Sequence, residues 1–221
     1  VPLIPLRLWL PELQATSKKR HKEVVALMNQ VLPCDTVFRG TFEGFQPVFT
    51  HRGIDLPFPA LSDGYRGFIG VVADMLFHLQ SVCPKGRKLT DLTGVVMIDD
   101  IDLHLHPSWQ RTVVTTLAAA FPRLQFVVTS HSPIVAGTLY AENIRVVESP
   151  PDGPSTIHSV QERVHGLTVD QLLTGSLFGL PSSRSPAEQR KLQTMAAQTG
   201  KPSKPDAAIE FLKELAGQTP E

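Results

Sequence analysis

The sequence has little of what disulfide-bonded, thiolate-metal or membrane-spanning proteins need. Its 221 residues include two cysteines, Cys34 and Cys83, which lie far apart and form no CxxC or zinc-ligand spacing. A disulfide framework or a thiolate metal site is therefore not expected, and a reducing, cytoplasmic location is predicted. Charged residues interrupt every apolar run before it reaches membrane-spanning length, so no transmembrane helix and no membrane partner are predicted.

Net charge is also absent, because 21 lysines and arginines offset 21 aspartates and glutamates and give a formal net charge of +0 at pH 7. This balance provides no general attraction to nucleic acid or anionic membranes. The hydrophobic share of 42% is enough to fill a core. Residues 1–10 lack a basic segment, a small-residue cleavage site and an initiator methionine, so they do not resemble a secretory signal. We expect the chain to be a processed product or a piece of a longer protein.

Apolar periodicity predicts an α/β chain. The strand–helix–strand–helix–strand order between Val95 and Val147 is typical of a parallel sheet, and the β-branched run at 95–98 fits a buried central strand. Helices are predicted at 16–32, 65–82, 108–120, just after Pro133, and at 169–173, 187–198 and 206–216, and strands at 36–38, 46–50, 54–58, 95–98, 125–129, 144–147 and 155–160.

The first predicted helix begins with a basic run, Lys18, Lys19, Arg20, His21 and Lys22. We favour a solvated helix face as its interpretation, with a phosphate-contacting patch as the alternative.

Two adjacent carboxylates, Asp99 and Asp100, follow the apolar run at 95–98. This position is the carboxyl edge of a parallel sheet, where ligands bind in such folds. Paired carboxylates are costly to bury unless a cation or a reaction needs them. One can hold Mg²⁺ while the next orients or deprotonates a water molecule. The alternative is a strand that ends in a solvated acidic turn.

Further polar residues follow at the same predicted edge. Asp102, His104 and His106 come next in the chain, and the following strand ends in Thr-Ser-His-Ser-Pro, with His131 also at a carboxyl edge. A lone His104 or His106 is more typical of a hydrogen-bonded packing residue, whereas His131 lies between a strand end and a helix start. Successive strands that deliver Asp and then His to one rim indicate a site.

A third segment, Leu61-Ser62-Asp63-Gly64, precedes an apolar helix. Ser62 or Asp63 can cap this helix, and Gly64 allows a ligand to approach the backbone closely.

Together these segments resemble ABC-type ATPases of the SMC/RecF-like branch. The match is closest to the bacterial ATPases of the defence and overcoming-lysogenization group, in which D-[DE]-x-D-x-x-L-H-P and T-S-H-S-P recur. The resemblance spans residues 58–147, and residues 166–173 resemble the tail of that group. Leu61–Gly64 resembles the LSxG signature, Val95–Asp100 the Walker B strand, Asp102 with residues 105–107 the D-loop region, and residues 129–133 the switch-histidine loop.

The resemblance implies a P-loop NTPase-like α/β fold, with ATP and Mg²⁺ as cofactors and a head-to-tail homodimer around two nucleotides. Asp99 would hold Mg²⁺, Asp100 would be the general base, and His131 would contact the γ-phosphate and the attacking water. The signature residues Leu61, Ser62, Asp63 and Gly64 would bind the nucleotide held by the opposite subunit, and Asp102 would help link the two sites. Such phosphoryl transfer depends on positioning and charge stabilisation.

Two features depart from the family pattern. Asp100 stands where the family usually has Glu, which withdraws the carboxylate by about a bond length. The Walker A motif GxxxxGK[ST] is missing, because residues 64–70 contain no lysine and residues 200–202 lack the strand and the upstream glycine. We therefore expect the phosphate-gripping lobe to lie outside this chain and the chain alone to be inactive.

The resemblance also divides the chain. Residues 1–60 are expected to be a remnant of the amino-terminal lobe with a helical insertion. Residues 61–165 would form the signature, Walker B and switch-histidine lobe, and residues 166–221 a helical tail.

The leading hypothesis is the carboxyl-terminal part of an ATPase coupled to bacterial phage defence or DNA-associated activity, with an effector nuclease or nucleic acid as a further partner. One alternative is a non-hydrolysing, ATPase-like scaffold that lacks the phosphate loop. Another is a metal-dependent hydrolase with Asp99, Asp100, His104, His106 and His131 as ligands.

Overall fold

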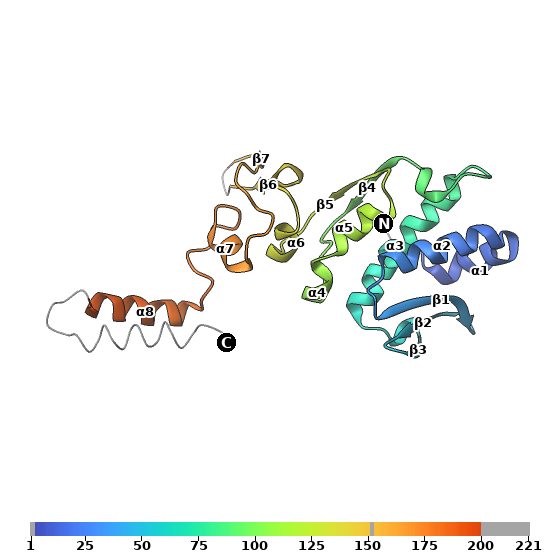
Figure 1. Ribbon diagram of the computed structural model, residues 1–221, viewed down its shortest axis with the longest axis horizontal. Coiled ribbons are helices and arrows are strands. Elements are labelled where there is room, and N and C mark those ends of the chain that lie inside the picture. Colours follow the sequence, from blue (N-terminus) through green and yellow to red (C-terminus); the bar gives the residue numbers. More distant parts are fainter. Residues whose placement is uncertain (1–2, 151–152, 200–221) are drawn as a thin grey trace.

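Helices and short strands alternate along the computed structural model, which describes residues 3–150 and 153–199 (Figure 1). The predicted helix at 206–216 lies outside the described residues. The helices are α1 (Leu6–Thr16), α2 (Lys18–Val31), α3 (Asp63–Val82), α4 (Pro107–Gln110), α5 (Val113–Ala120), α6 (Pro133–Gly137), α7 (Val169–Thr174) and α8 (Pro186–Thr199), with 3-10 turns η1 (Phe58–Ala60), η2 (Leu89–Asp91) and η3 (Ala141–Asn143). The strands are β1 (Thr36–Glu43), β2 (Gln46–His51), β3 (Ile54–Pro57), β4 (Gly94–Ile98), β5 (Leu124–Val128), β6 (Arg145–Glu148) and β7 (Thr156–Ser159).

The amino-terminal region contains two helices where the sequence predicted one. Pro11 lies inside α1. A proline inside a helix removes a backbone hydrogen bond and is ordinarily a sign that a helix ends, so the sequence did not predict this helix. Leu6, Trp9 and Leu10 nevertheless turn to the core. The side chain of Ser17 accepts a hydrogen bond from the Arg20 amide at 3.4 Å and caps α2, so the second helix starts at Lys18 rather than at residue 16.

The strands β1, β2 and β3 form an antiparallel meander. The β2–β3 turn has φ values of 50° at Arg52 and 80° at Gly53, the left-handed pair that suits a two-residue hairpin. Phe38 and Phe49 stack on the inner face of this sheet with ring centroids 4.8 Å apart. All three predicted strands are confirmed here.

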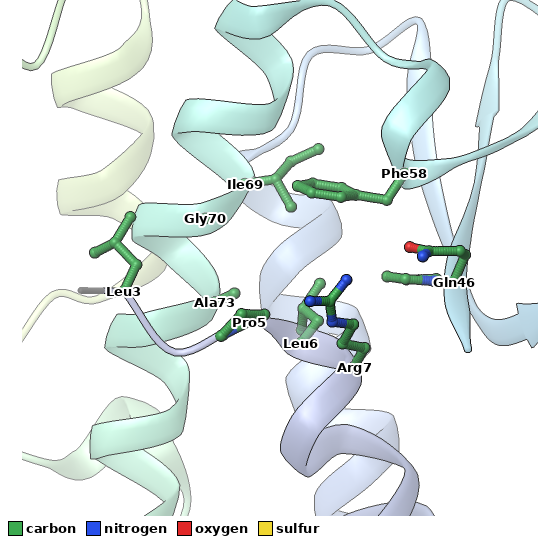
Figure 2. A pocket seen from close by; sticks show the side chains of 10 residues that line it. Leu3, Pro5, Leu6, Arg7, Gln46, Phe58, Ile69, Gly70 and Ala73 are labelled. Atoms are coloured by element: carbon green, nitrogen blue, oxygen red, sulfur yellow. The ribbon is translucent and has the colours of Figure 1, made fainter.

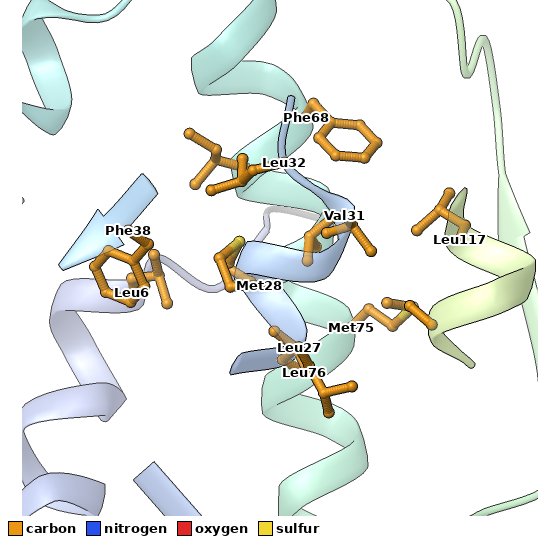
Figure 3. Close-up of a cluster of buried hydrophobic side chains, with 14 of the residues drawn as sticks. Leu6, Leu27, Met28, Val31, Leu32, Phe38, Phe68, Met75, Leu76 and Leu117 are labelled. Atoms are coloured by element: carbon orange, nitrogen blue, oxygen red, sulfur yellow. The ribbon is translucent and has the colours of Figure 1, made fainter. Parts of the chain in front are cut away.

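The core lies where α1, α2, α3, α5 and the inner face of the meander meet. Figure 3 shows side chains from these elements pointing toward one another. α3 runs through the centre and buries one stripe of its surface, because apolar residues recur along it at helical spacing. The fully buried side chains include Met28, Phe38, Ile69, Leu76 and Leu117.

The strands β4 and β5 pair in parallel, with Gly94 opposite Leu124 and Ile98 opposite Val128. This parallel pair, flanked by helices, confirms the predicted α/β class. The prediction that residues 144–147 form a third strand of this sheet is wrong, however. β6 pairs antiparallel with β7 in a separate sheet, because β7 follows β6 closely along the chain and an antiparallel pair needs no long crossover.

The expectation that residues 95–98 form a buried central strand is also wrong. Ile98 is buried and Val96 packs against the core, but Val95 is 61% exposed and Met97 is 78% exposed. Strand residues alternate between faces, and the described helices cover one face of this sheet. On β5, Val127 is likewise 45% exposed.

The predicted helix at 108–120 is divided into α4 and α5, since Thr112 has φ −125° and leaves the helical region.

No helix in the described part of the chain is long and apolar enough to cross a membrane.

Candidate functional site

The carboxyl ends of β4 and β5 are joined by one hydroxyl group. The Asp100 amide donates to Thr129 Oγ1 at 2.8 Å, and the same hydroxyl donates to Asp99 Oδ1. Backbone bonds from the Thr129 amide to the Ile98 carbonyl and from the Ile101 amide to the Thr129 carbonyl, each 3.0 Å, extend the ladder past the last paired residues. Thr129 therefore fixes one oxygen of Asp99 and leaves the rest of this exposed carboxylate available to a cation.

Asp100 occupies a backbone conformation that few side chains adopt. Its φ is 48°, and His104 in the same loop has φ 59°. Aspartate tolerates the left-handed region better than most residues. The Leu103 amide donates to the Asp100 carbonyl at 2.9 Å and closes a turn directly after the strand. The conformation leaves the Asp100 carboxylate exposed, beyond the end of the sheet.

His131 lies at the end of β5 on the same edge of the sheet. Its ring is exposed and forms no hydrogen bond with the described residues. The residue after it, Ser132, is buried and caps α6 by accepting bonds from the amides of Ile134 and Val135 at 3.1 and 3.3 Å. His131 is thus an unpaired side chain on a backbone segment that is firmly held.

The side chain of Gln110 connects the two loops of this edge. Its Oε1 accepts a hydrogen bond from Ser132 Oγ at 2.7 Å, and its Nε2 donates to the Leu105 carbonyl at 2.9 Å and to the Asp102 carbonyl at 3.5 Å. Carbonyl oxygens only accept, so these partners define the orientation of the amide. Sequence reasoning missed this residue, because a glutamine in a short helix carries no motif.

The signature-like segment begins α3 and contacts the Asp100–His106 loop. A Cβ atom at Gly64 would lie 2.2 Å from the His104 carbonyl oxygen, so glycine is needed for this close approach of two backbone segments. The sequence assigned that freedom to a ligand, and the structure gives an intramolecular reason for it. Ser62 is the N-cap residue and its exposed side chain makes no capping bond, so its hydroxyl remains available.

The other predicted site residues differ in accessibility. Leu61 is only 6% exposed, so its side chain belongs to the core and its backbone alone could meet a ligand. Asp63 is exposed and forms an ion pair with Arg66. Asp102 is half-buried, and its Oδ1 has no hydrogen-bond partner among the described residues. Buried polar atoms ordinarily have a hydrogen-bond partner, which can be a protein group or an ordered water molecule.

A polar cluster that no sequence motif revealed lies beside the start of α3. Tyr65 Oη donates to Asp35 Oδ1 at 3.1 Å, and Arg52 Nε lies 3.4 Å from Asp35 Oδ2. Burial acts to raise the pKa of Asp35, but the bonds from Tyr65, Thr36 and Arg52 together outweigh it and lower this pKa below its ordinary value. Burial and the neighbouring carboxylate raise the pKa of Tyr65.

Aromatic contacts extend from this cluster to the proposed site. The centroid of the Tyr65 ring lies 5.1 Å from that of His51 and 5.1 Å from that of Trp109. The rings of Trp109 and Phe68 are also in contact, with centroids 4.7 Å apart. Trp109 belongs to α4, three residues after His106. The start of α3 is therefore held between the meander and α4, and this packing positions Ser62 relative to the carboxyl edge.

The ligands of the metal-hydrolase alternative are not gathered into one site. Among residues 3–150 and 153–199, no group of three or more His, Cys, Asp or Glu side chains could hold a metal ion. His106 instead caps α4, with its Nδ1 2.7 Å from Ser108 Oγ. For Mg²⁺ in a nucleotide complex the requirement is smaller, since one or two carboxylates suffice when phosphates and water supply the other ligands, and the free oxygen of Asp99 fits that role.

A pocket of about 270 Å³ lies away from this edge, between α1, β2, η1 and α3 (Figure 2). Figure 2 shows Phe58 and Ile69 on one side and Leu6 with Arg7 on the other. Its lining is mostly apolar and contains none of the predicted site residues.

Comparison with known proteins identifies relatives for this arrangement. The family described as "AAA domain, putative AbiEii toxin, Type IV TA system" matches residues 38–136, which include most of the meander, the signature-like segment and both strand ends. The Escherichia coli protein "Retron Ec83 probable ATPase" is 38% identical over 98 residues, which cover 44% of this chain and 18% of that protein. The Bacillus mycoides "Septu protein PtuA" is 28% identical over 183 residues, covering 81% of this chain and 24% of that protein. The chain thus spans about a fifth to a quarter of the length of these two relatives.

Two solved structures are similar at a lower level. One, reported under ATP-driven dimerization and DNA stimulated activation of SMC ATPases, has a TM-score of 0.48 at 14% identity and covers 69% of this chain and 89% of that chain. The other, an SmcHead bound to the C-winged helix domain of ScpA, has a TM-score of 0.47 at 15% identity and covers 72% of this chain and 51% of that chain. These scores are too low to assign a fold by themselves. The match of residues 38–136 to the AAA-domain family and the similarity to the retron and Septu proteins agree with the resemblance of residues 61–133 to ABC/SMC-like AAA ATPases.

Proposed function

We propose that this chain supplies the signature, Walker B and switch-histidine elements of an ATPase that hydrolyses ATP between two subunits. The observation that carries the proposal is the shared edge of β4 and β5, where Thr129 links the backbone of Asp100 to the carboxylate of Asp99 two residues before His131. Residues 61–165 form the lobe that contains this edge. The family match supports the proposal through the chemistry of its class, which is phosphoryl transfer.

In this proposal Asp99 would hold the Mg²⁺ of the nucleotide complex, which would neutralise charge on the phosphates. Asp100 accepts a proton from the attacking water, and His131 donates a hydrogen bond to the oxygen of the transferred phosphoryl group. Both side chains are exposed at the rim, so they can meet a nucleotide without rearrangement of the core. Preorganised donors and acceptors of this kind account for most of the rate enhancement in such reactions.

The signature-like segment serves the second site of a head-to-tail dimer. The free hydroxyl of Ser62, at the N-cap of α3, binds the γ-phosphate held by the other subunit. The unsatisfied Oδ1 of Asp102 accepts a hydrogen bond across the same interface. The Walker A lysine and its loop come from polypeptide outside these 221 residues, since GxxxxGK[ST] is missing from them and the chain spans a minor part of its relatives. Residues 1–60 then belong to the amino-terminal lobe, and residues 166–221 form a carboxyl-terminal extension whose described helices are α7 and α8.

The biological setting we propose is bacterial phage defence in the cytoplasm, with an effector nuclease as partner. Support for this setting comes from the retron and Septu relatives. The 221-residue chain alone is expected to be inactive, because it lacks the loop that grips the β- and γ-phosphates.

Subunit mixing tests the composite site. In the full-length protein, Ser62→Arg disables the signature half and Asp100→Asn disables the hydrolytic half, so each variant alone is inactive. An equimolar mixture regains about one quarter of the wild-type ATPase rate, since about half of the dimers are heterodimers and each contains one intact site of two. A Ser81→Arg variant, altered at an exposed residue near the other end of α3, serves as the control and stays active alone. A mixture as inactive as its components contradicts a site shared between subunits.

A further inference from the structure

Positive charge gathers at one end of the molecule, away from the proposed ATP site. The start of α2 and the loop between α3 and β4 lie together at one end of the molecule (Figure 1). Six exposed cations come from these two segments, and we call them the basic patch: Lys18, Lys19, Lys22, Lys85, Arg87 and Lys88.

The patch is assembled by a clamp between the two segments. Arg20 is largely buried, pairs with Glu23 at 2.8 Å and donates to the Arg87 carbonyl at 3.0 Å. Glu23 Oε1 in turn accepts a hydrogen bond from the Leu89 amide at 2.6 Å. The clamp therefore holds the loop against the first turns of α2, although the cations that it brings together repel one another.

No acidic residue in the described part of the chain pairs with a cation of the patch. The lysines of α2 also stand at a helix amino terminus, where the helix dipole disfavours positive charge, and the first turn of α2 contains no acidic residue. The whole chain has a net charge of +0, so the excess of positive charge in the patch is a local feature that the overall composition does not show.

The patch and the proposed ATP site occupy opposite ends of the β4–β5 sheet. The loop at 83–91 leads into the amino end of β4 at Gly94, whereas Asp99 follows its carboxyl end. A five-residue strand is about 17 Å long, so the cations of the patch do not reach a nucleotide bound at Asp99. The patch needs a ligand of its own.

Phosphate is the group that this chemistry suits. Lys and Arg side chains contact the backbone of nucleic acids, while Lys is depleted in protein–protein interfaces. The loop at 83–91 contains no Phe, Tyr, Trp or His, so it offers no ring on which an unpaired base could stack. His21, within the basic run, is buried and points to the core. We propose that the basic patch binds the phosphate backbone of duplex nucleic acid, independently of its sequence.

Fluorescence anisotropy with the full-length protein tests this proposal in the absence of ATP. The probes are a labelled 30-base-pair DNA duplex and the corresponding RNA duplex, titrated at several salt concentrations. Two variants, Lys19→Gln with Lys22→Gln and Lys85→Gln with Lys88→Gln, each neutralise one half of the patch. Each is expected to weaken binding at least tenfold at low salt and to lower the slope of log K against log salt by about two, since each lost phosphate contact contributes about 0.9.

Matched controls separate the patch from overall charge. Arg163→Gln with Arg184→Gln removes two exposed cations from the other end of the chain and should leave affinity within twofold. Lys19→Arg with Lys22→Arg keeps the charge and should bind like the wild type. Equal loss of binding in the patch and control variants, or tighter binding of polyglutamate than of either duplex, overturns the proposal. The ATPase rate without nucleic acid should be unchanged in the patch variants, so this result and the test of the composite site can fail separately.

Discussion

At the scale of single residues, the tightest backbone contact of the proposed site involves Gly64. Glycine has no Cβ atom, and this allows the start of α3 to touch the His104 carbonyl. The contact explains why a glycine stands at this position of the signature-like segment without any reference to a ligand.

Replacing Gly64 with alanine should destabilise the protein. The new Cβ would lie 2.2 Å from a backbone oxygen that a side-chain rotation cannot move aside, and such overpacking costs about 1–3 kcal/mol. Gly67→Ala is the matched control, since a Cβ there meets nothing within 4 Å and should stabilise α3 by up to about 1 kcal/mol. Urea unfolding measures both. Equal stability of the two variants would contradict the described contact.

His21 should make stability depend on pH. Burial lowers its pKa below the ordinary histidine value, although a backbone hydrogen bond with Gly40 opposes the shift. The folded state therefore resists protonation of His21. As pH falls through about 6.5, the unfolded state binds more protons at this ring than the folded state does. The free energy of unfolding should decrease from pH 8 toward pH 5.

The His21→Leu variant identifies the source of that dependence. It removes the titrating ring, so its unfolding free energy should change less between those two pH values than that of the wild type. His78→Leu replaces a mostly exposed histidine and is the control. A pH dependence that His21→Leu leaves intact excludes His21 as its source.

At the scale of elements, Gln110 of α4 holds the Asp100–His106 loop to the start of α6. Gln110→Ala removes its bonds to Ser132 and Leu105, and about 1–3 kcal/mol of stability should be lost with these partly buried partners. Gln30→Ala alters an exposed glutamine of α2 and should change stability by less than about 0.5 kcal/mol. Thermal unfolding compares them, and a neutral Gln110→Ala would show that the bridge contributes nothing.

Elements were predictable from the sequence where local signals suffice. Strand ends at Ile98 and Val128 follow from apolar runs that stop at polar residues, and the edge that carries Asp99 and His131 was placed from these runs. α1 was missed because Pro11 breaks its pattern. The pairing of β6 with β7 was missed because strand partners depend on turn geometry rather than on composition. Gln110 was missed because its role exists only when two distant loops meet.

At the scale of the whole molecule, one face of the parallel sheet is uncovered in the described chain. Parallel sheets are ordinarily covered on both faces, yet Val95 and Met97 are mostly exposed. An apolar sheet surface of this kind favours association. The 221-residue chain alone should therefore self-associate as its concentration rises.

Polar substitutions on that face should reduce the association. Val95→Thr with Met97→Gln is expected to shift the chain toward monomer in light scattering across a dilution series. Val37→Thr with Ile54→Thr alters exposed apolar residues of the meander and provides the control. If both double variants associate as the wild type does, the uncovered face is not the cause.

The central claim is that Asp100 acts as the general base of an ATPase. The most direct test measures phosphate release by the full-length protein alongside ATP binding, for the wild type, Asp100→Asn and Asp100→Glu. Asp100→Asn should lower the rate by about 10²–10⁴-fold while ATP binding changes little, since a general base contributes in that range. Asp100→Glu keeps the carboxylate and should remain active. Near-wild-type turnover by Asp100→Asn would contradict the claim.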